Sequence, residues 1–154
     1  MYRLFVAVPI PDHIKSSLLQ LRVNIPGAKW TDGDQLHITL KFIGEVDSQK
    51  FIEIRDKLLE IRMDQFQLQI KGVGYYPPGN SSKRNVPKVL WAGIGDPVYI
   101  TKLRNKIENT FNELGLKREG RKFNPHVTLA RLKNSHSLSI AEFLSAYTTF
   151  KSDN

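Results

Sequence analysis

The stretches HITLKFIGEV (residues 37–46) and HVTLARLK (residues 126–133) repeat one pattern at two distant places in the chain. Each begins with His, a β-branched residue, Thr and Leu. Successive side chains of a β-strand point to opposite faces, so the histidine and the threonine share one face and the aliphatic pair shares the other. The sequence therefore predicts two strands that each bury an aliphatic pair and present an imidazole beside a hydroxyl.

The elements expected around these strands occur in the same order in both halves of the chain. In the first half, we expect a strand at 3–8, a helix at 12–23, the first histidine strand at 36–43, a helix capped by Asp47 and a strand at 66–73. In the second half, we expect a strand at 88–94, a helix from Asp96 to Gly115, the second histidine strand at 123–132 and a helix at 139–148.

This order predicts a duplicated unit, with one domain over residues 1–154 made of two lobes joined by the Gly- and Pro-rich loop at 72–87. If the halves are related by an approximate two-fold axis, both His-Thr faces line one groove between the lobes. By the logic of the repeat, a further strand should follow the helix at 139–148, but the sequence stops at Asn154. We therefore expect the second half to be one strand short.

Composition limits the chemistry that is available to the chain. There is no cysteine, which excludes disulfides, thiolate nucleophiles and Cys-based zinc sites and suits a cytoplasmic protein. The apolar stretches are far shorter than the roughly 20 residues that span a bilayer, so no membrane anchor is expected. With 23 Lys and Arg against 15 Asp and Glu, the net charge of +8 favours a polyanionic partner such as nucleic acid.

Two imidazoles on either side of one phosphorus atom form a complete acid–base set. One neutral ring accepts a proton from an attacking water or hydroxyl, and one protonated ring donates to the departing oxygen. Each role contributes about 10²- to 10⁴-fold in rate, and neither requires a metal or a cofactor. A metal site held by His37 and His126 is the alternative, but neither motif carries a matching Asp or Glu, and Thr is a poor ligand.

The motifs HITLKFIGE and NPHVTLAR resemble the paired His-x-Thr motifs of the two-histidine (2H) phosphoesterases. Within that superfamily, the chain looks most like the RNA 2′,3′-cyclic phosphodiesterases, first described as 2′-5′ RNA ligases. The resemblance extends to RLFVAVPIPD, GVGYYPP and VLWAGI, and so covers nearly the whole chain. It implies a bilobal α+β fold with two antiparallel sheets lining a central cleft, helices on the outside, and a C-terminal strand or hairpin that this sequence lacks.

The same resemblance implies metal-independent opening of a 2′,3′-cyclic phosphate to a 2′-phosphate. His37 and His126 match the acid–base pair, Thr39 and Thr128 match the phosphate contacts, and Arg131 matches a phosphate-binding arginine. The residues themselves leave open which histidine is the base; the resemblance implies that His126 activates water and His37 protonates the leaving 3′ oxygen. Strict alternation would turn Arg131 to the core, so we expect a strand end or a bulge before it.

Other residues are candidates for contacts with substrate. Lys41 follows Thr39 on the same strand face and could extend an anion site, whereas Tyr75, Tyr76 and Phe123 could stack a base. Trp91 is expected in the core. A basic group could contact RNA phosphates beyond the scissile group; it comprises Lys83, Arg84, Lys88, Lys117, Arg118, Arg121 and Lys122.

Three functions remain open at this point. The first is a cyclic phosphodiesterase acting on an RNA with a 2′,3′-cyclic phosphate end or on a small cyclic nucleotide, in either direction of a reversible 2′-5′ ligation. The second is a 2′-5′ oligonucleotide phosphodiesterase, and the third is a non-catalytic RNA-binding module. For each of them we expect a monomer.

Overall fold

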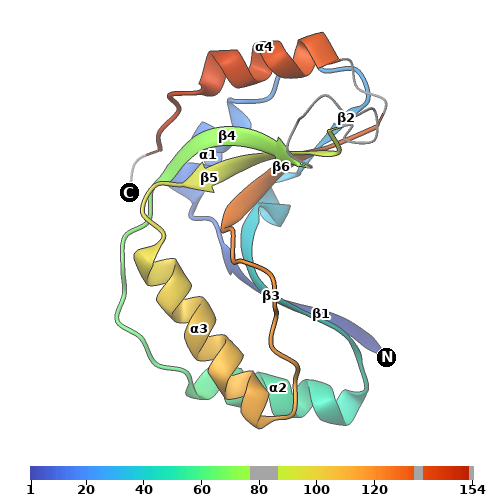
Figure 1. Ribbon diagram of the computed structural model, residues 1–154, viewed down its shortest axis with the longest axis vertical. Helices are drawn as coiled ribbons and strands as arrows, with labels where there is room; N and C mark the ends of the chain where they lie inside the picture. Colours follow the sequence, from blue (N-terminus) through green and yellow to red (C-terminus); the bar gives the residue numbers. More distant parts are fainter. Residues whose placement is uncertain (77–86, 134–136, 153–154) are drawn as a thin grey trace. The chain divides into compact units, whose positions relative to one another are not determined.

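Apart from one short strand and one 3-10 turn, the strands and helices of the computed structural model follow the order expected from the sequence (Figure 1). The structure describes residues 1–76, 87–133 and 137–152. The strands are β1 (Tyr2–Pro9), β2 (Ala28–Trp30), β3 (His37–Val46), β4 (Ile70–Tyr76), β5 (Val89–Ile94) and β6 (His126–Leu132). The helices are α1 (Asp12–Leu19), α2 (Ser48–Glu60), α3 (Val98–Glu113) and α4 (Ser137–Tyr147), with a 3-10 turn, η1, at Gly33–Gln35.

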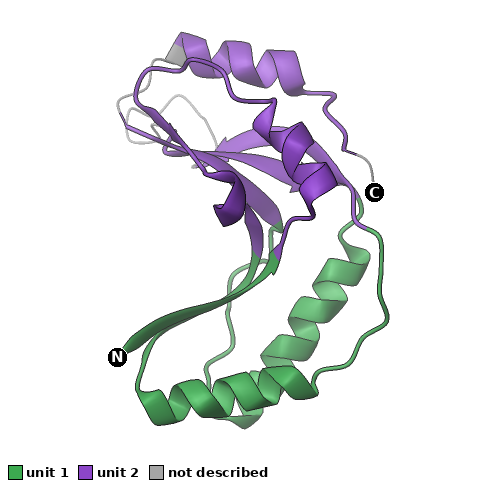
Figure 2. Cartoon of the chain, turned by 180° about the vertical axis from the view of Figure 1, so that it is seen from behind, with its two compact units in different colours: residues 1–8, 39–67, 96–125 green, residues 9–38, 68–95, 126–154 purple. Residues whose placement is uncertain are grey.

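The chain forms two compact units, and each takes segments from both halves of the sequence (Figure 2). Unit 1 consists of residues 1–8, 39–67 and 96–125, and unit 2 consists of residues 9–38, 68–95 and 126–154. The expectation that each half of the sequence builds its own lobe is therefore wrong. Strands that are neighbours in space come from opposite halves of the chain.

Hydrogen bonds connect the strands in the order β1-β3-β6-β5-β4, with β2 also paired to β6. The α+β class is confirmed, but the strands form one six-stranded sheet and not the two sheets expected. The short strand β2 and the turn η1 were not expected, because three residues are too few to show a periodic pattern.

The core of unit 2 lies on one face of its strands. Alternate residues of β3, β5 and β6 are buried there, and α1 and α4 add their apolar stripes. Trp30 of β2 contacts Phe143 of α4 with ring centroids 5.8 Å apart, which places α4 over this face. The buried apolar residues of the unit include Ile14, Leu18, Ile38, Ile70, Leu90, Ala92, Val127, Leu129, Ala130, Ile140 and Phe143.

Two β-bulges interrupt the regular alternation of unit 2. In β4 the register shifts between Ile70 and Val73, where Gly72 has a φ of 74°, a conformation that glycine adopts without strain. In β6 the shift lies opposite Leu90 and Trp91, so that Leu129 is the extra residue. Each bulge exchanges the two faces of its strand for all residues that follow.

The described C-terminal residues pair with β4. Lys151 forms an antiparallel bridge with Lys71, the Gly72 N–H donates to the Phe150 carbonyl (2.9 Å), and the Ser152 N–H donates to the Ile70 carbonyl (2.9 Å). These contacts occupy the place, after α4, where the repeat predicts a strand.

In unit 1, α2 and α3 begin and end at residues that the sequence marks. The Asp47 carboxylate accepts a hydrogen bond from the Lys50 N–H (2.8 Å) and caps α2, as expected. Asp96 accepts from the Val98 N–H (3.2 Å) at the start of α3, although Pro97, and not Asp96, occupies the N-cap position. Gly115, with a φ of 84°, follows the C-cap of α3.

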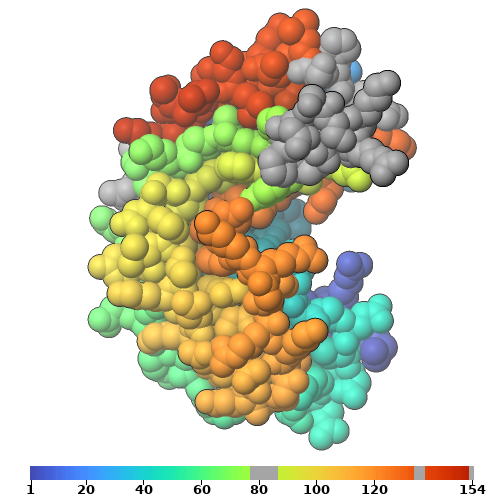
Figure 3. All heavy atoms as spheres, viewed as in Figure 1, coloured from blue at the N-terminus to red at the C-terminus, as the bar shows by residue number. Residues whose placement is uncertain are grey.

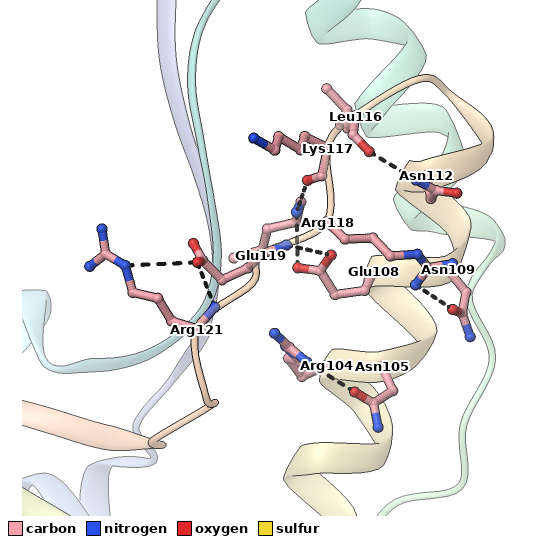
Figure 4. A network of polar contacts seen from close by, with 11 residues as sticks. Arg104, Asn105, Glu108, Asn109, Asn112, Leu116, Lys117, Arg118, Glu119 and Arg121 are labelled. Carbon is pink, nitrogen blue, oxygen red and sulfur yellow. Dashed lines mark hydrogen bonds and ion pairs between the residues drawn. The ribbon is translucent and has the colours of Figure 1, made fainter.

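A buried ion pair connects β3 to α3 within unit 1. Lys41 and Glu108 are only 6% and 4% exposed, and the Lys41 Nζ lies 2.9 Å from the Glu108 Oε1. The same ammonium donates to the Lys117 carbonyl (3.0 Å), and the Glu108 Oε2 accepts from the Glu119 N–H (3.3 Å) (Figure 4). The pair therefore holds the main chain of the segment that follows α3.

We expect Glu108→Ala to lower the free energy of unfolding by about 3–5 kcal/mol, because the Lys41 ammonium then stays buried without its counter-charge. The double variant Lys41→Met/Glu108→Leu should lose much less, since packed apolar side chains replace both ions. The matched control is Lys57→Ala, which breaks the exposed Lys57–Glu60 pair (3.4 Å) and should cost less than about 1 kcal/mol. Urea unfolding measures all three, and equal losses in Glu108→Ala and the control would contradict this account.

Candidate active site

The two histidine strands lie next to each other in unit 2. They are antiparallel, with Ile38 of β3 paired to Val127 of β6, and both of these side chains are 0% exposed. In this register His37 lies opposite Thr128, and His126 is its diagonal neighbour on the same face; such neighbours are typically about 7–8 Å apart, with their Cβ atoms somewhat closer. The predicted alternation of buried aliphatic and half-buried polar residues is confirmed in both motifs.

The His37 ring is held by the turn that precedes its strand. Its Nδ1 lies 2.6 Å from the Gln35 carbonyl oxygen, at the end of η1. Because a carbonyl only accepts hydrogen bonds, Nδ1 carries the hydrogen and Nε2 is the nitrogen that exchanges a proton in acid–base chemistry. The 3-10 turn that the sequence did not reveal thus sets the tautomer and the direction of this imidazole.

The His126 ring lies beside two aromatic side chains. The Tyr76 ring meets it edge-on with centroids 5.4 Å apart, and the Trp91 ring lies 6.3 Å away. Tyr76 and Trp91 also contact each other at 5.5 Å. This aromatic cluster restricts the imidazole from one side. Tyr76 is therefore the predicted tyrosine that the structure brings to the histidine face.

Two glycines make room for the Trp91 indole. A Cβ atom on Gly74, the residue paired with Trp91, would lie 2.2 Å from the indole Cζ2, and a Cβ on Gly93 would lie 3.3 Å from its Cζ3. The indole therefore lies flat across both glycines, on the face that carries Thr128. Its Nε1 is buried without a hydrogen-bond partner among the described residues, so packing alone fixes this ring.

The bulge at Leu129 turns Arg131 toward the histidine face. Leu129 and Ala130 are both buried, at 3% and 0% exposed, and Arg131 is exposed. Without the extra residue, Arg131 would share the face of Val127 and Leu129. The expectation of a bulge before Arg131 is confirmed, and it places this guanidinium on the side of the sheet that carries His126 and Thr128.

Three expectations need correction. Lys41 does not extend an anion site, because its ammonium is buried and bonded to Glu108 and to the Lys117 carbonyl. Tyr75 is paired with the fully buried Leu90 and so lies on the core face, away from His126. Trp91 is half-buried on the histidine face and is not a core residue. The sequence signal that could have predicted this position is the alternation of glycines in GVG (72–74) and WAG (91–93), which leaves room for a large ring on one face.

The remaining candidates belong elsewhere in the chain. Thr39 is half-buried and continues β3 into unit 1. Phe123 is also in unit 1, where the Arg104 guanidinium lies 5.4 Å from its ring. Lys83 and Arg84 fall outside the described residues.

No three His, Cys, Asp or Glu side chains within 1–76, 87–133 and 137–152 gather closely enough to hold a metal ion. In the same residues, no helix has the length and apolar character needed to cross a membrane.

We expect Gly74→Ala to lower the free energy of unfolding by about 1–3 kcal/mol, because the new methyl group overlaps the Trp91 indole. Gly120→Ala is the matched control, since no atom lies within 4 Å of a Cβ at that position. Urea unfolding of both variants decides the point. If Gly74→Ala is as stable as the control, the indole is not confined as described.

Comparison with known proteins gives a consistent result. The family described as LigT like Phosphoesterase matches residues 8–91 and 95–154. The chain is 32% identical over 151 residues to the RNA 2′,3′-cyclic phosphodiesterase of Archaeoglobus fulgidus, covering 96% of this chain and 81% of that protein. Among solved structures, it is similar to TT0787 of Thermus thermophilus (26% identity, TM-score 0.73, 86% of this chain and 75% of that one). It is also similar to E. coli LigT complexed with 3′-AMP (27% identity, TM-score 0.70, 88% and 74%).

Proposed function

The chain belongs to the LigT-like phosphoesterases, and we propose that it hydrolyses RNA 2′,3′-cyclic phosphate ends to 2′-phosphates with His37 and His126 as its acid–base pair. The observation that carries the proposal is the register of β3 and β6, which puts both imidazoles on one face of unit 2 as diagonal neighbours. The names of the Archaeoglobus relative and of the E. coli structure with 3′-AMP support this substrate class.

The reaction divides between the two rings. His126 accepts a proton from water as its oxygen attacks phosphorus in line with the 3′ oxygen, and the P–O3′ bond breaks. His37, protonated, donates through Nε2 to the departing 3′ oxygen, because its Nδ1 hydrogen is engaged with Gln35. The products are a 2′-phosphate and a free 3′ hydroxyl, and the next proton exchange with water restores both rings.

The negative charge on phosphorus needs donors that do not take part in proton transfer. Thr128 lies directly opposite His37 in the antiparallel register, and Arg131 is exposed on the same face beyond the bulge. We assign the Thr128 hydroxyl and the Arg131 guanidinium to the non-bridging oxygens, where a preorganised donor stabilises the transition state. From the sequence pattern alone, we propose the same role for Thr39, the equivalent residue of the first motif.

We also propose that the enzyme acts as a monomer and in the cytoplasm. All residues assigned to proton transfer come from one chain, so a monomer suffices for catalysis. A chain without cysteine also suits the reducing cytoplasm.

We expect turnover of an RNA 12-mer that ends in a 2′,3′-cyclic phosphate to continue in EDTA and to yield the 2′-phosphate. His37→Ala and His126→Ala should each lower kcat by about 10²- to 10⁴-fold, because each removes one proton-transfer partner. Product analysis separates 2′- from 3′-phosphate, and fluorescence anisotropy measures RNA binding by the same variants. His13→Ala, in α1, is the control. RNA binding that persists without any turnover in the wild type would favour a binding module instead.

We expect Arg131→Gln to lower kcat/KM for the cyclic phosphate by about 10- to 100-fold, since a hydrogen bond from a charged donor is lost. Lys133→Gln removes an equal charge two residues further on and should change kcat/KM by less than about 3-fold. Steady-state kinetics compare the two variants. Similar effects of both would mean that Arg131 contributes only general charge.

A further inference from the structure

Unit 1 carries a groove that contains none of the residues assigned to catalysis. It has a volume of about 1080 Å³ and lies between the segment that follows α2 and the exposed side of α3. One wall is residues 62–67. The other is a single stripe of α3, formed by Tyr99, Lys102, Asn105, Lys106 and Asn109. These residues recur every three or four positions, so they lie on one face of the helix.

The lining of the groove is cationic, aromatic and amide-rich. Arg62, Lys102 and Lys106 face a single carboxylate, Asp64, and the α3 stripe contains no acidic residue. An ordinary solvent-exposed helix face mixes both signs of charge. The excess of cations here suits a polyanion.

An aromatic pair gives the groove a stacking surface. The rings of Phe66 and Tyr99 lie nearly parallel, with centroids 5.8 Å apart and an interplanar angle of 24°. Tyr99 is 50% exposed, and the Lys102 ammonium lies 5.3 Å from its ring. Bases of single-stranded nucleic acids stack on such rings while nearby cations contact the backbone phosphates.

Hydrogen bonds from side chains to main-chain carbonyls fix the spacing of the two walls. The Lys106 Nζ donates to the Arg62 carbonyl (2.6 Å), which ties the two walls together. The Arg62 guanidinium donates to the Leu59 carbonyl (2.7 Å) at the C-terminal end of α2. The spacing of the walls therefore does not depend on a bound ligand.

The groove continues along α3 through two smaller cavities. One, of about 300 Å³, shares Asn105 and Asn109 with the groove and adds Arg104, Glu108, Arg118 and Glu119. The next, of about 430 Å³, shares Arg118 and adds the segment 116–120. In the space-filling view this segment, in orange, lies on the surface beside α3 (Figure 3).

The buried Lys41–Glu108 pair organises the far end of this path. It holds the Lys117 carbonyl and the Glu119 N–H, while the Lys117 and Arg118 side chains remain exposed (Figure 4). The Glu119 carboxylate accepts a hydrogen bond from the Arg121 N–H (3.0 Å), which lowers the pKa of that carboxyl and keeps it ionised, and the Arg121 Nε lies 3.9 Å from the same oxygen. Cationic side chains outnumber carboxylates along the path from residue 62 to residue 118, and the Glu108 and Glu119 carboxylates on it are each paired with a cation.

We infer that this groove binds the single-stranded RNA segment upstream of the cyclic phosphate, with a base stacked on Tyr99 and phosphates on Lys102 and its neighbours. The inference rests on the proposed function, because the strand is part of the substrate. Catalysis and strand recognition would then use different parts of the substrate. The histidines act on the terminal nucleotide, and the groove distinguishes an RNA strand from a mononucleotide.

The test compares two substrates, the RNA 12-mer with a 2′,3′-cyclic phosphate end and cytidine 2′,3′-cyclic phosphate. Tyr99→Ala should lower kcat/KM for the 12-mer by about 5- to 150-fold, the range for one lost stacking contact. Lys102→Glu should lower it at least about 10-fold and should reduce the slope of log(kcat/KM) against log salt by about 0.7. Neither variant should change turnover of the mononucleotide.

Matched controls lie elsewhere in unit 1. Tyr2→Ala removes a tyrosine of similar exposure, 47%, that packs on Phe51 at 4.9 Å as Tyr99 packs on Phe66. Lys57→Glu reverses a charge on α2 outside the groove. Both controls should leave the preference for the 12-mer unchanged, and thermal unfolding checks that every variant is folded.

The outcomes are distinguishable. Unchanged 12-mer turnover in both groove variants overturns the inference, and so does an equal loss on both substrates, since that points to a general structural effect. If the wild type turns over neither substrate, the proposed function fails, and anisotropy with the same 12-mer still tests the groove directly. Competition by poly-glutamate as strong as that by RNA of equal charge would overturn the assignment to RNA.

Discussion

The pairing of Ile38 with Val127 is the constraint on which the rest of the site depends. Both side chains are fully buried, so neither strand can slip by one residue without moving an aliphatic side chain into water and a histidine into the core. The positions of the two imidazoles are therefore set by the burial of the aliphatic side chains on the opposite face of the same strands. The relative position of His37 and His126 thus depends on Ile38 and Val127, which take no part in the chemistry.

Irregularities in the sheet direct the remaining side chains. The bulge at Gly72 exchanges the faces of β4, so that Tyr76 meets His126 and Tyr75 turns to the core beside Leu90. The bulge at Leu129 does the same in β6 and brings Arg131 to the face of Thr128. In both strands the side chain that reaches the histidine face follows the bulge, and bulges are frequent next to active sites.

The sequence predicts the parts of this arrangement that depend on local order. Alternation within HITL and HVTL, the Asp47 cap and the stop at Gly115 all follow from neighbours a few residues away. The sequence does not predict which of Tyr75 and Tyr76 faces His126, because the answer depends on the extra residue of the bulge in β4. Lys41 was misassigned because its partner, Glu108, is 67 residues away, and no periodic pattern reports such a contact.

The Lys41–Glu108 pair raises the question of why a sequence would bury two charges where apolar residues would suffice. Burial of an ion pair costs desolvation energy that its attraction barely recovers, so stability alone does not explain it. What an apolar pair lacks is the further donor and acceptor that this pair directs at the Lys117 carbonyl and the Glu119 N–H. Those bonds fix a main chain whose side chains face solvent. The buried Lys41–Glu108 pair thus positions the main chain that carries the exposed Lys117 and Arg118 side chains.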